Sequence, residues 1–108
     1  MNESKMGPYE NRVIDALKKF KDVSISRIGL RGPELYFDVQ ATFPSKKEAQ
    51  NGVVDMEKAL QKEFKGAKKV NNSDWNNKPT WLQAEWKTNK QDEDNKPWEA
   101  FISIETKI

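Results

Sequence analysis

The stretch from Leu35 to Phe43 alternates strictly between apolar and polar side chains. Its apolar positions are Leu35, Phe37, Val39, Ala41 and Phe43, and its polar positions are Tyr36, Asp38, Gln40 and Thr42. Because successive side chains of a β-strand point to opposite faces, the pattern predicts a strand with one face in the core and one polar face. A sheet built around this strand needs a covering layer on one face.

Two segments repeat apolar residues at the spacing of an amphipathic helix. The first opens at Gly7-Pro8, after a flexible N-terminal tail of residues 1–7, and its apolar stripe is Tyr9, Val13, Ala16, Leu17 and Phe20. The second starts at Ser45, where Glu48 is placed to complete a capping box, and it runs to about Phe64. Its buried stripe is Ala49, Val53, Met56, Leu60 and Phe64, and Gly66 is expected to end it in a left-handed conformation.

Four further segments have the composition of strands. Val23 to Leu30 is β-branched and small, and its apolar phase slips between Ile25 and Ile28, which indicates a bulge or a strand covered on both faces. A tight turn at residues 31–34 joins it to the alternating strand. Beyond the second helix, residues 67–70 predict a short strand, 71–79 an Asn-rich connection, and 80–88 and 98–106 a pair of strands.

The order helix, strand, strand, helix, strand, strand, strand predicts a single α+β domain over residues 1–108. We expect two helices packed on one face of a mainly antiparallel sheet. This corresponds to a ferredoxin-like unit with a C-terminal β-hairpin.

The tripeptide Asn-Lys-Pro occurs twice, at residues 77–79 and 95–97. Proline is tolerated at the first residue of a strand, and Asn favours turns. We therefore interpret both copies as junctions between a loop and a strand rather than as a repeated ligand motif.

Residues 9–71 resemble the cytosolic C-terminal domain of cation diffusion facilitator transporters in the order of their elements. The segment VIDALKKFKDVSISRIGLRGPELYFDVQATFPSKKEAQNGVVDMEKALQKEFKGAKKV has that domain's helix, strand, Arg-Gly turn, alternating strand and long helix. The resemblance implies a ferredoxin-like unit and a tendency to dimerise. Domains of that family commonly bind metal through His and acidic side chains, and because this chain has no His, no functional residue is carried over.

Composition excludes several classes of site. The chain has no Cys and no His, so the usual ligands of zinc and iron–sulfur centres and the Cys-His and Ser-His nucleophile systems are missing. We expect no enzyme activity and no cofactor. The net charge of +2 is too small for a strong non-specific polyanion binder. Without a signal peptide or a bilayer-spanning apolar run, the expected location is the cytoplasm.

The tryptophans point to a candidate binding surface. Alternation places Leu82, Ala84 and Trp86 on one face of their strand, as it does Trp98, Ala100, Ile102 and Ile104 on theirs. Trp81 and Phe101 then lie on the more polar face with Glu85, joined by Trp75 from the preceding loop. These four residues predict a protein-binding surface. The alternative is that a loop or the N-terminal tail covers the aromatic side chains.

Two charged clusters give further candidates. Lys58, Lys62, Lys65, Lys68 and Lys69 can track the phosphates of a nucleic acid, although acidic residues are interspersed among them. The acidic tip Asp92, Glu93 and Asp94 can offer oxygen ligands to Ca²⁺ or Mg²⁺, although it lacks the spacing of an EF-hand.

Two function classes follow from these surfaces, and a third class, an enzyme or metal protein, would need a cleft with carboxylates of perturbed pKa. The first is a non-catalytic accessory module of inhibitor, immunity or adaptor type, which binds a protein partner or a second copy of itself as a homodimer. The second is a nucleic-acid-associated protein that uses the Lys58 to Lys69 cluster.

Overall fold

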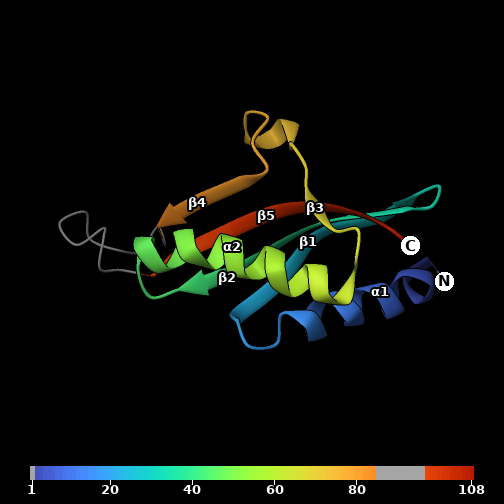
Figure 1. Cartoon of the computed structure of the whole chain (residues 1–108), viewed down its shortest axis with the longest axis horizontal. Coiled ribbons are helices and arrows are strands. Elements are labelled where there is room, and N and C mark those ends of the chain that lie inside the picture. Colours follow the sequence, from blue (N-terminus) through green and yellow to red (C-terminus); the bar gives the residue numbers. More distant parts are fainter. Residues whose placement is uncertain (1, 85–96) are drawn as a thin grey trace.

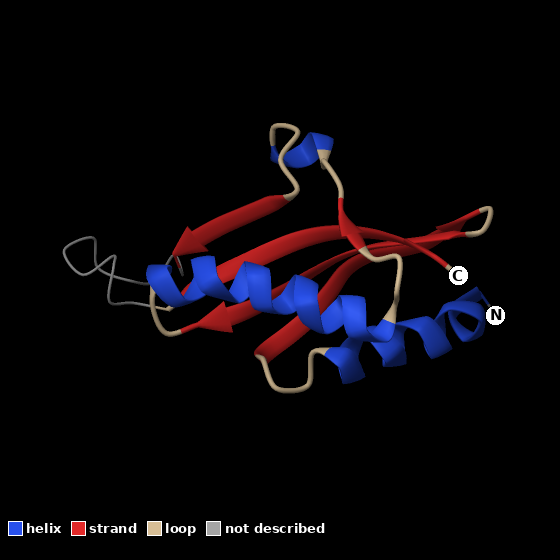
Figure 2. Cartoon of the chain, viewed as in Figure 1, coloured by secondary structure: helices blue, strands red, loops and turns tan. Residues whose placement is uncertain are grey.

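Among the described residues, two helices cover one face of an antiparallel sheet, and the other face carries no helix longer than one turn (Figures 1 and 2). The computed structural model describes residues 2–84 and 97–108, with the backbone alone for residues 2–6. The elements are α1 (Asn2–Ala16), β1 (Lys21–Arg31), β2 (Glu34–Phe43), α2 (Lys46–Glu63), β3 (Lys68–Lys69), the 3₁₀ turn η1 (Ser73–Trp75), β4 (Thr80–Ala84) and β5 (Trp98–Lys107). The predicted α+β class and the predicted order of elements are confirmed.

The last strand lies in the middle of the sheet. The strand order of the sheet is β1, β2, β5, β3, and β4 also pairs with β5. All of these pairs are antiparallel. The predicted β4–β5 hairpin is present, but β5 is inserted between β2 and the β3/β4 edge instead of being added outside the unit. In a ferredoxin-like β-α-β-β-α-β unit this central strand comes first in the chain. Here it comes last, which brings the two termini to the same end of the molecule (Figure 1).

Strands β3 and β4 form one edge strand that is interrupted by a loop. Lys69 lies opposite Ile104, and Thr80 lies opposite Ile102. The single position between them, Ser103, bonds both ends of the interruption: its carbonyl accepts from the Val70 N–H at 3.0 Å, and its N–H donates to the Pro79 carbonyl at 3.0 Å. Residues 70–79 therefore leave the sheet as a loop, which we call the 70–79 loop.

The neck of the 70–79 loop is closed by backbone hydrogen bonds. The Asn72 N–H donates to the Lys78 carbonyl, and the Asn77 N–H donates to the Asn72 carbonyl, both at 3.0 Å. Asn76 and Asn77 have left-handed backbone angles, φ 56° and 59°, which Asn tolerates better than most residues. The first Asn-Lys-Pro copy thus lies where a loop becomes a strand, as predicted. The second copy begins within residues 85–96, outside the described residues.

The helix-covered face of the sheet holds the core. Leu35, Phe37, Val39 and Ala41 are fully buried, as predicted from their alternation. Met56, Leu60 and Phe64 of the predicted α2 stripe are buried against them, with the Phe37 and Phe64 ring centroids 6.0 Å apart. Ala49 and Val53 of the same stripe are buried against Trp98 and Ala100. Trp98, Ala100, Ile102 and Ile104 are buried on the same face, whereas Trp86 lies outside the described residues.

The first helix begins earlier than predicted. It starts at Asn2, within the stretch predicted as a tail, and contains Pro8. Glu3, Lys5 and Met6 are good helix formers. A proline inside a helix removes one backbone donor, and here the helix continues through it.

The ends of α2 confirm one prediction and correct another. Ser45 caps the helix, since its Oγ accepts from the Glu48 N–H at 3.2 Å. The predicted left-handed stop at Gly66 is wrong, because the only described glycine with a positive φ is Gly32, in the β1–β2 turn. The helix ends because Phe64 takes an extended backbone, φ −123° and ψ 104°, and buries its ring in the core.

The phase slip in the first strand is a β-bulge. The pairing register between β1 and β2 shifts between Ile25 and Arg27, so Ser26 is the extra residue. This confirms the bulge among the two predicted alternatives. Among residues 2–84 and 97–108, no helix is long and apolar enough to cross a bilayer.

Candidate protein-binding face

The face of the sheet that α1 and α2 do not cover is called here the open face. Its side chains are set by register with the polar positions of β2. They include Ser24, Arg27, Gly29 and Arg31 from β1, Tyr36, Asp38, Gln40 and Thr42 from β2, Lys68 from β3, Trp81 and Gln83 from β4, and Glu99, Phe101, Ser103 and Glu105 from β5.

Three aromatic side chains come together on the open face. Trp81 and Phe101 are directly opposite each other in the β4–β5 pairing. The rings of Trp75 and Phe101 meet edge to face, with centroids 6.1 Å apart and planes at 65°. All three side chains are half-buried. The structure thus assembles the aromatic side chains that the sequence singled out, and we call them the aromatic cluster. Glu85, predicted beside them, lies outside the described residues.

A buried carboxylate lies next to the aromatic cluster. Asp38 is only 6% exposed, although the alternation predicts a polar, outward position for it. Its Oδ1 accepts from the Ser103 hydroxyl at 2.6 Å, and its Oδ2 accepts from the Asn72 side-chain amide at 3.1 Å. Arg27 forms an ion pair with it, Nε to Oδ2 at 3.0 Å. A buried carboxylate is costly unless it is paired and hydrogen-bonded, and these three partners meet that requirement.

Burial of Asp38 results from the 70–79 loop, which the sequence could not place. Asn72 is 5% exposed and reaches Asp38 from this loop. The same side chain caps η1, since its Oδ1 accepts from the Asp74 N–H at 2.9 Å. Trp75, the last residue of η1, is therefore held against Phe101 by a chain of contacts that starts at Asp38. The sequence analysis did not single out Asp38, Ser103 and Asn72, because all three occupy positions that were expected to be solvated.

The remainder of the open face carries charges of both signs. The Tyr36 ring lies close over Gly29, where a Cβ atom would collide with it, and the Arg27 and Arg31 guanidinium carbons are 5.2 and 5.3 Å from the ring centroid. Beside the aromatic cluster the nearest charge in register is Glu99, which accepts from the Gln40 amide at 3.3 Å. Glu99 is thus the acidic group in register beside the aromatic cluster, and the β1 end of the face carries Arg27 and Arg31.

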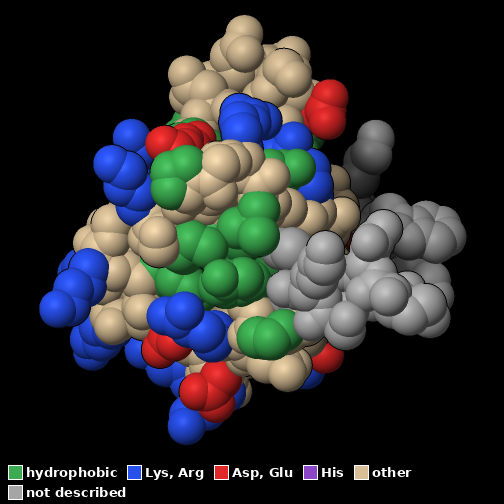
Figure 3. All heavy atoms as spheres, turned by 90° about the vertical axis from the view of Figure 1, so that its right-hand side faces the viewer, with side chains coloured by type: hydrophobic (Ala, Val, Ile, Leu, Met, Phe, Trp, Pro, Cys, Tyr) green, Lys and Arg blue, Asp and Glu red, His purple; other side chains and the backbone are tan. Residues whose placement is uncertain are grey.

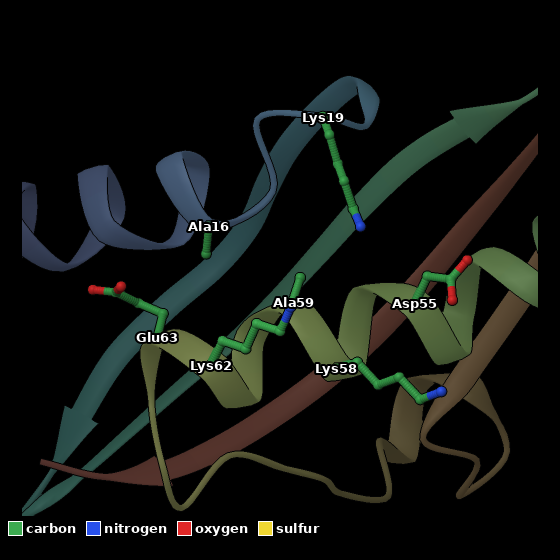
Figure 4. A pocket seen from close by; sticks show the side chains of 7 residues that line it. All are labelled: Ala16, Lys19, Asp55, Lys58, Ala59, Lys62 and Glu63. Atoms are coloured by element: carbon green, nitrogen blue, oxygen red, sulfur yellow. The ribbon is translucent and has the colours of Figure 1, made fainter.

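The predicted basic cluster is divided over the surface of α2 and β3. Lys58 and Lys62 line a hollow of about 410 Å³ between α1 and α2, together with Lys19, but Asp55 and Glu63 line it too (Figure 4). Lys69 forms an ion pair with Glu57 at 3.7 Å. Lys65 and Lys68 are exposed. The arrangement is a surface of mixed charge rather than a continuous basic track.

No metal site is formed by the residues that the structure describes, since no group of three or more acidic, His or Cys side chains among them is placed to hold an ion. The acidic tip Asp92, Glu93 and Asp94 lies outside these residues. No family model, curated protein or solved structure matches the chain. The resemblance to the transporter domain therefore stays a prediction.

Proposed function

We propose that the protein is a non-catalytic protein-binding module of accessory type, an inhibitor, immunity protein or adaptor, that acts in the cytoplasm. The observation that carries the proposal is the aromatic cluster on the open face. Large aromatic side chains are enriched in protein interfaces and dominate their binding energy. Trp75, Trp81 and Phe101 belong to the same face of one sheet, and their half-buried rings keep area that a partner can cover.

The contacts below the aromatic cluster support this use. An anchor binds more tightly when its side chain is already ordered in the free protein, because less conformational entropy is lost on binding. Trp75 is held through η1, Asn72 and Asp38, and Trp81 donates from Nε1 to Gln83 Oε1 at 3.3 Å. Both side chains are thus positioned before a partner arrives.

The charge beside the aromatic cluster favours a basic partner. Glu99 is half-buried at this end of the face, whereas Glu105, on the same strand and face, lies opposite Lys68 and lines a hollow with Arg27 and Arg31. Acidic groups at the rim of an apolar anchor steer the approach of a positively charged surface. We therefore propose a protein segment that presents Lys or Arg next to apolar or aromatic side chains.

The proposal is tested with three immobilised baits incubated with extract of the native cell. They are the wild type, the Trp81→Ala/Phe101→Ala variant, and a control variant, Val54→Ala, that removes an exposed apolar side chain of α2. We expect a protein that is retained by the wild type and the control and lost by the aromatic variant. It is then purified, and its Kd for each bait is measured by calorimetry. Loss of two interface anchors is expected to weaken binding at least about 100-fold. Equal affinity for all three baits would overturn the proposal.

The predicted alternative, nucleic-acid binding by the lysine cluster, is tested by a second experiment with the same variants. Fluorescently labelled single-stranded and duplex oligonucleotides are titrated with the wild type at two salt concentrations. Binding that weakens steeply with salt and is unchanged in the Trp81→Ala/Phe101→Ala variant would favour this alternative.

A further inference from the structure

The outer edge of β1 is free. In the described part of the chain β1 is at one end of the sheet and pairs with β2 alone. It has 11 residues, most of them exposed. A long free edge presents a row of backbone donors and acceptors that can pair with another strand.

The sequence of β1 is complementary to itself when read in the opposite direction. If two copies run antiparallel about a two-fold axis between Ser26 and Arg27, apolar residues oppose apolar ones and small residues oppose small ones. The opposed pairs are Ser26 with Arg27, Ile25 with Ile28, and Ser24 with Gly29. Beyond them Leu30 and Arg31 reach Val23 and Asp22, where β1 has a second register shift and Asp22 has a left-handed backbone angle, φ 53°. Pairs of this kind stabilise neighbouring antiparallel strands.

The bulge gives these opposed side chains a common face. In a regular strand Ile25 and Ile28 would point to opposite faces, because three positions separate them. The bulge at Ser26 instead places Ile25 opposite Val39 and Ile28 opposite Phe37, so both lie on the helix-covered face. A bulge normally hinders pairing with a regular strand. Against a second copy the Ser26 bulge does not, since it lies beside its own symmetry mate, and the second register shift, between Lys21 and Ser24, lies at the outer end of the pairing.

Exposed apolar side chains flank the same edge. Arg12 of α1 donates from Nε to Glu63 of α2 at 2.7 Å. Ile14, two residues further along α1, is rotated by about 200° and so faces away from α2. It is 40% exposed, and Leu30 at the end of β1 is 43% exposed. Hydrophobic side chains are gathered at the end of the molecule that carries the termini and the β1–β2 turn (Figure 3).

We propose that two copies of the chain form a symmetric dimer by antiparallel pairing of their β1 strands, with the two α1 helices side by side above the junction. The axis is perpendicular to the sheet, so the sheet continues from one copy to the next and the contact closes on itself. The open faces of the two copies then lie on the same side of the continuous sheet. The dimer offers two aromatic clusters to a partner, a consequence that rests on the proposed function.

The first test compares molar mass across a concentration series by light scattering after gel filtration. We expect the wild type to reach the molar mass of a dimer when its concentration is raised to about 0.1 mM. Leu30→Lys should raise the dimer dissociation constant at least about tenfold. Val54→Lys is the matched control, because Val54 is also a half-exposed apolar residue, at 46%, but belongs to α2. A monomeric wild type, or an equal effect of both substitutions, would overturn the proposal.

The second test checks the register with single cysteines, since the natural chain has none. In the proposed pairing the two Ser26 Cα atoms are about 6 Å apart, within the range of a disulfide, whereas the two Ser24 Cα atoms are more than about 12 Å apart. Under mild oxidation Ser26→Cys should therefore cross-link quantitatively and Ser24→Cys should stay uncross-linked. The opposite result would reject this register. The Trp81→Ala/Phe101→Ala variant is expected to remain dimeric, so failure of the functional proposal is distinguishable from failure of this one.

Discussion

The two faces of the sheet are built in different ways. On the helix-covered face, buried apolar side chains follow a strict period and pack against the stripe of α2. On the open face, order depends on a few polar contacts centred on Asp38 and on an irregular loop that brings Trp75 to Phe101. The comparison indicates that stability comes chiefly from the first face, which leaves the half-buried aromatic side chains of the second face available for the proposed binding.

The largest effects are expected on the helix-covered face. Phe37→Ala and Leu60→Ala each remove a fully buried side chain and leave a cavity, which costs about 2–5 kcal/mol of unfolding free energy. Urea titration followed by circular dichroism measures the loss. Wild-type stability in both variants would contradict the assignment of the core.

A smaller loss of unfolding free energy is expected for Asp38→Ala on the open face. The substitution leaves the Ser103 hydroxyl and the Asn72 amide without their acceptor, and an unpaired buried polar group costs about 1–3 kcal/mol. Gln40→Ala is the control, because Gln40 lies on the same strand and face but is only half-buried. If both variants lose equal stability in the same urea titration, the buried contacts have no special role.

Asn72→Ala is expected to cost about 1 kcal/mol, the usual value of a lost helix cap, and to act mainly on the 70–79 loop. Hydrogen exchange should speed up at the Asp74 and Trp75 amides and stay unchanged in β2 and β5. Faster exchange across the whole sheet would show instead that the loop supports the fold.

The smallest effect is expected for charge reversal at Lys62, Lys65 and Lys69. Lys62 and Lys65 are exposed and Lys69 is half-buried, and substitutions at such surface positions usually change stability by less than about 0.5 kcal/mol each. The triple variant should therefore melt within a few degrees of the wild type, as measured by calorimetry. A large drop in melting temperature would show that these lysines stabilise the fold.

Periodic features could be predicted from the sequence. The alternation of β2, the stripe of α2 and the slip in β1 each reflect burial on one face, and each is present in the structure. The end of α2 near Phe64 was also predicted, but its cause was not, because the extended backbone of Phe64 depends on where that ring packs. The burial of Asp38 could not be predicted either, since it follows from a contact with Asn72, 34 residues away.

The candidate site was predictable in part. Alternation placed Trp81 and Phe101 on one face, and their pairing in register agrees. The contact of Trp75 with Phe101 depends on the interruption between β3 and β4, where both ends of the loop bond Ser103. Nothing periodic marks that interruption, since the sequence shows only an Asn-rich segment.

We propose that the helix-covered face stabilises the protein and the open face binds a partner. The most direct measurement takes the Trp81→Ala/Phe101→Ala variant and determines, on one preparation, its unfolding free energy and its affinity for the purified partner. Because the two rings are only half-buried, stability should fall by no more than about 2 kcal/mol in total, while affinity falls at least about 100-fold. A variant that unfolds, or one that folds and binds as tightly as the wild type, would contradict this division between the faces.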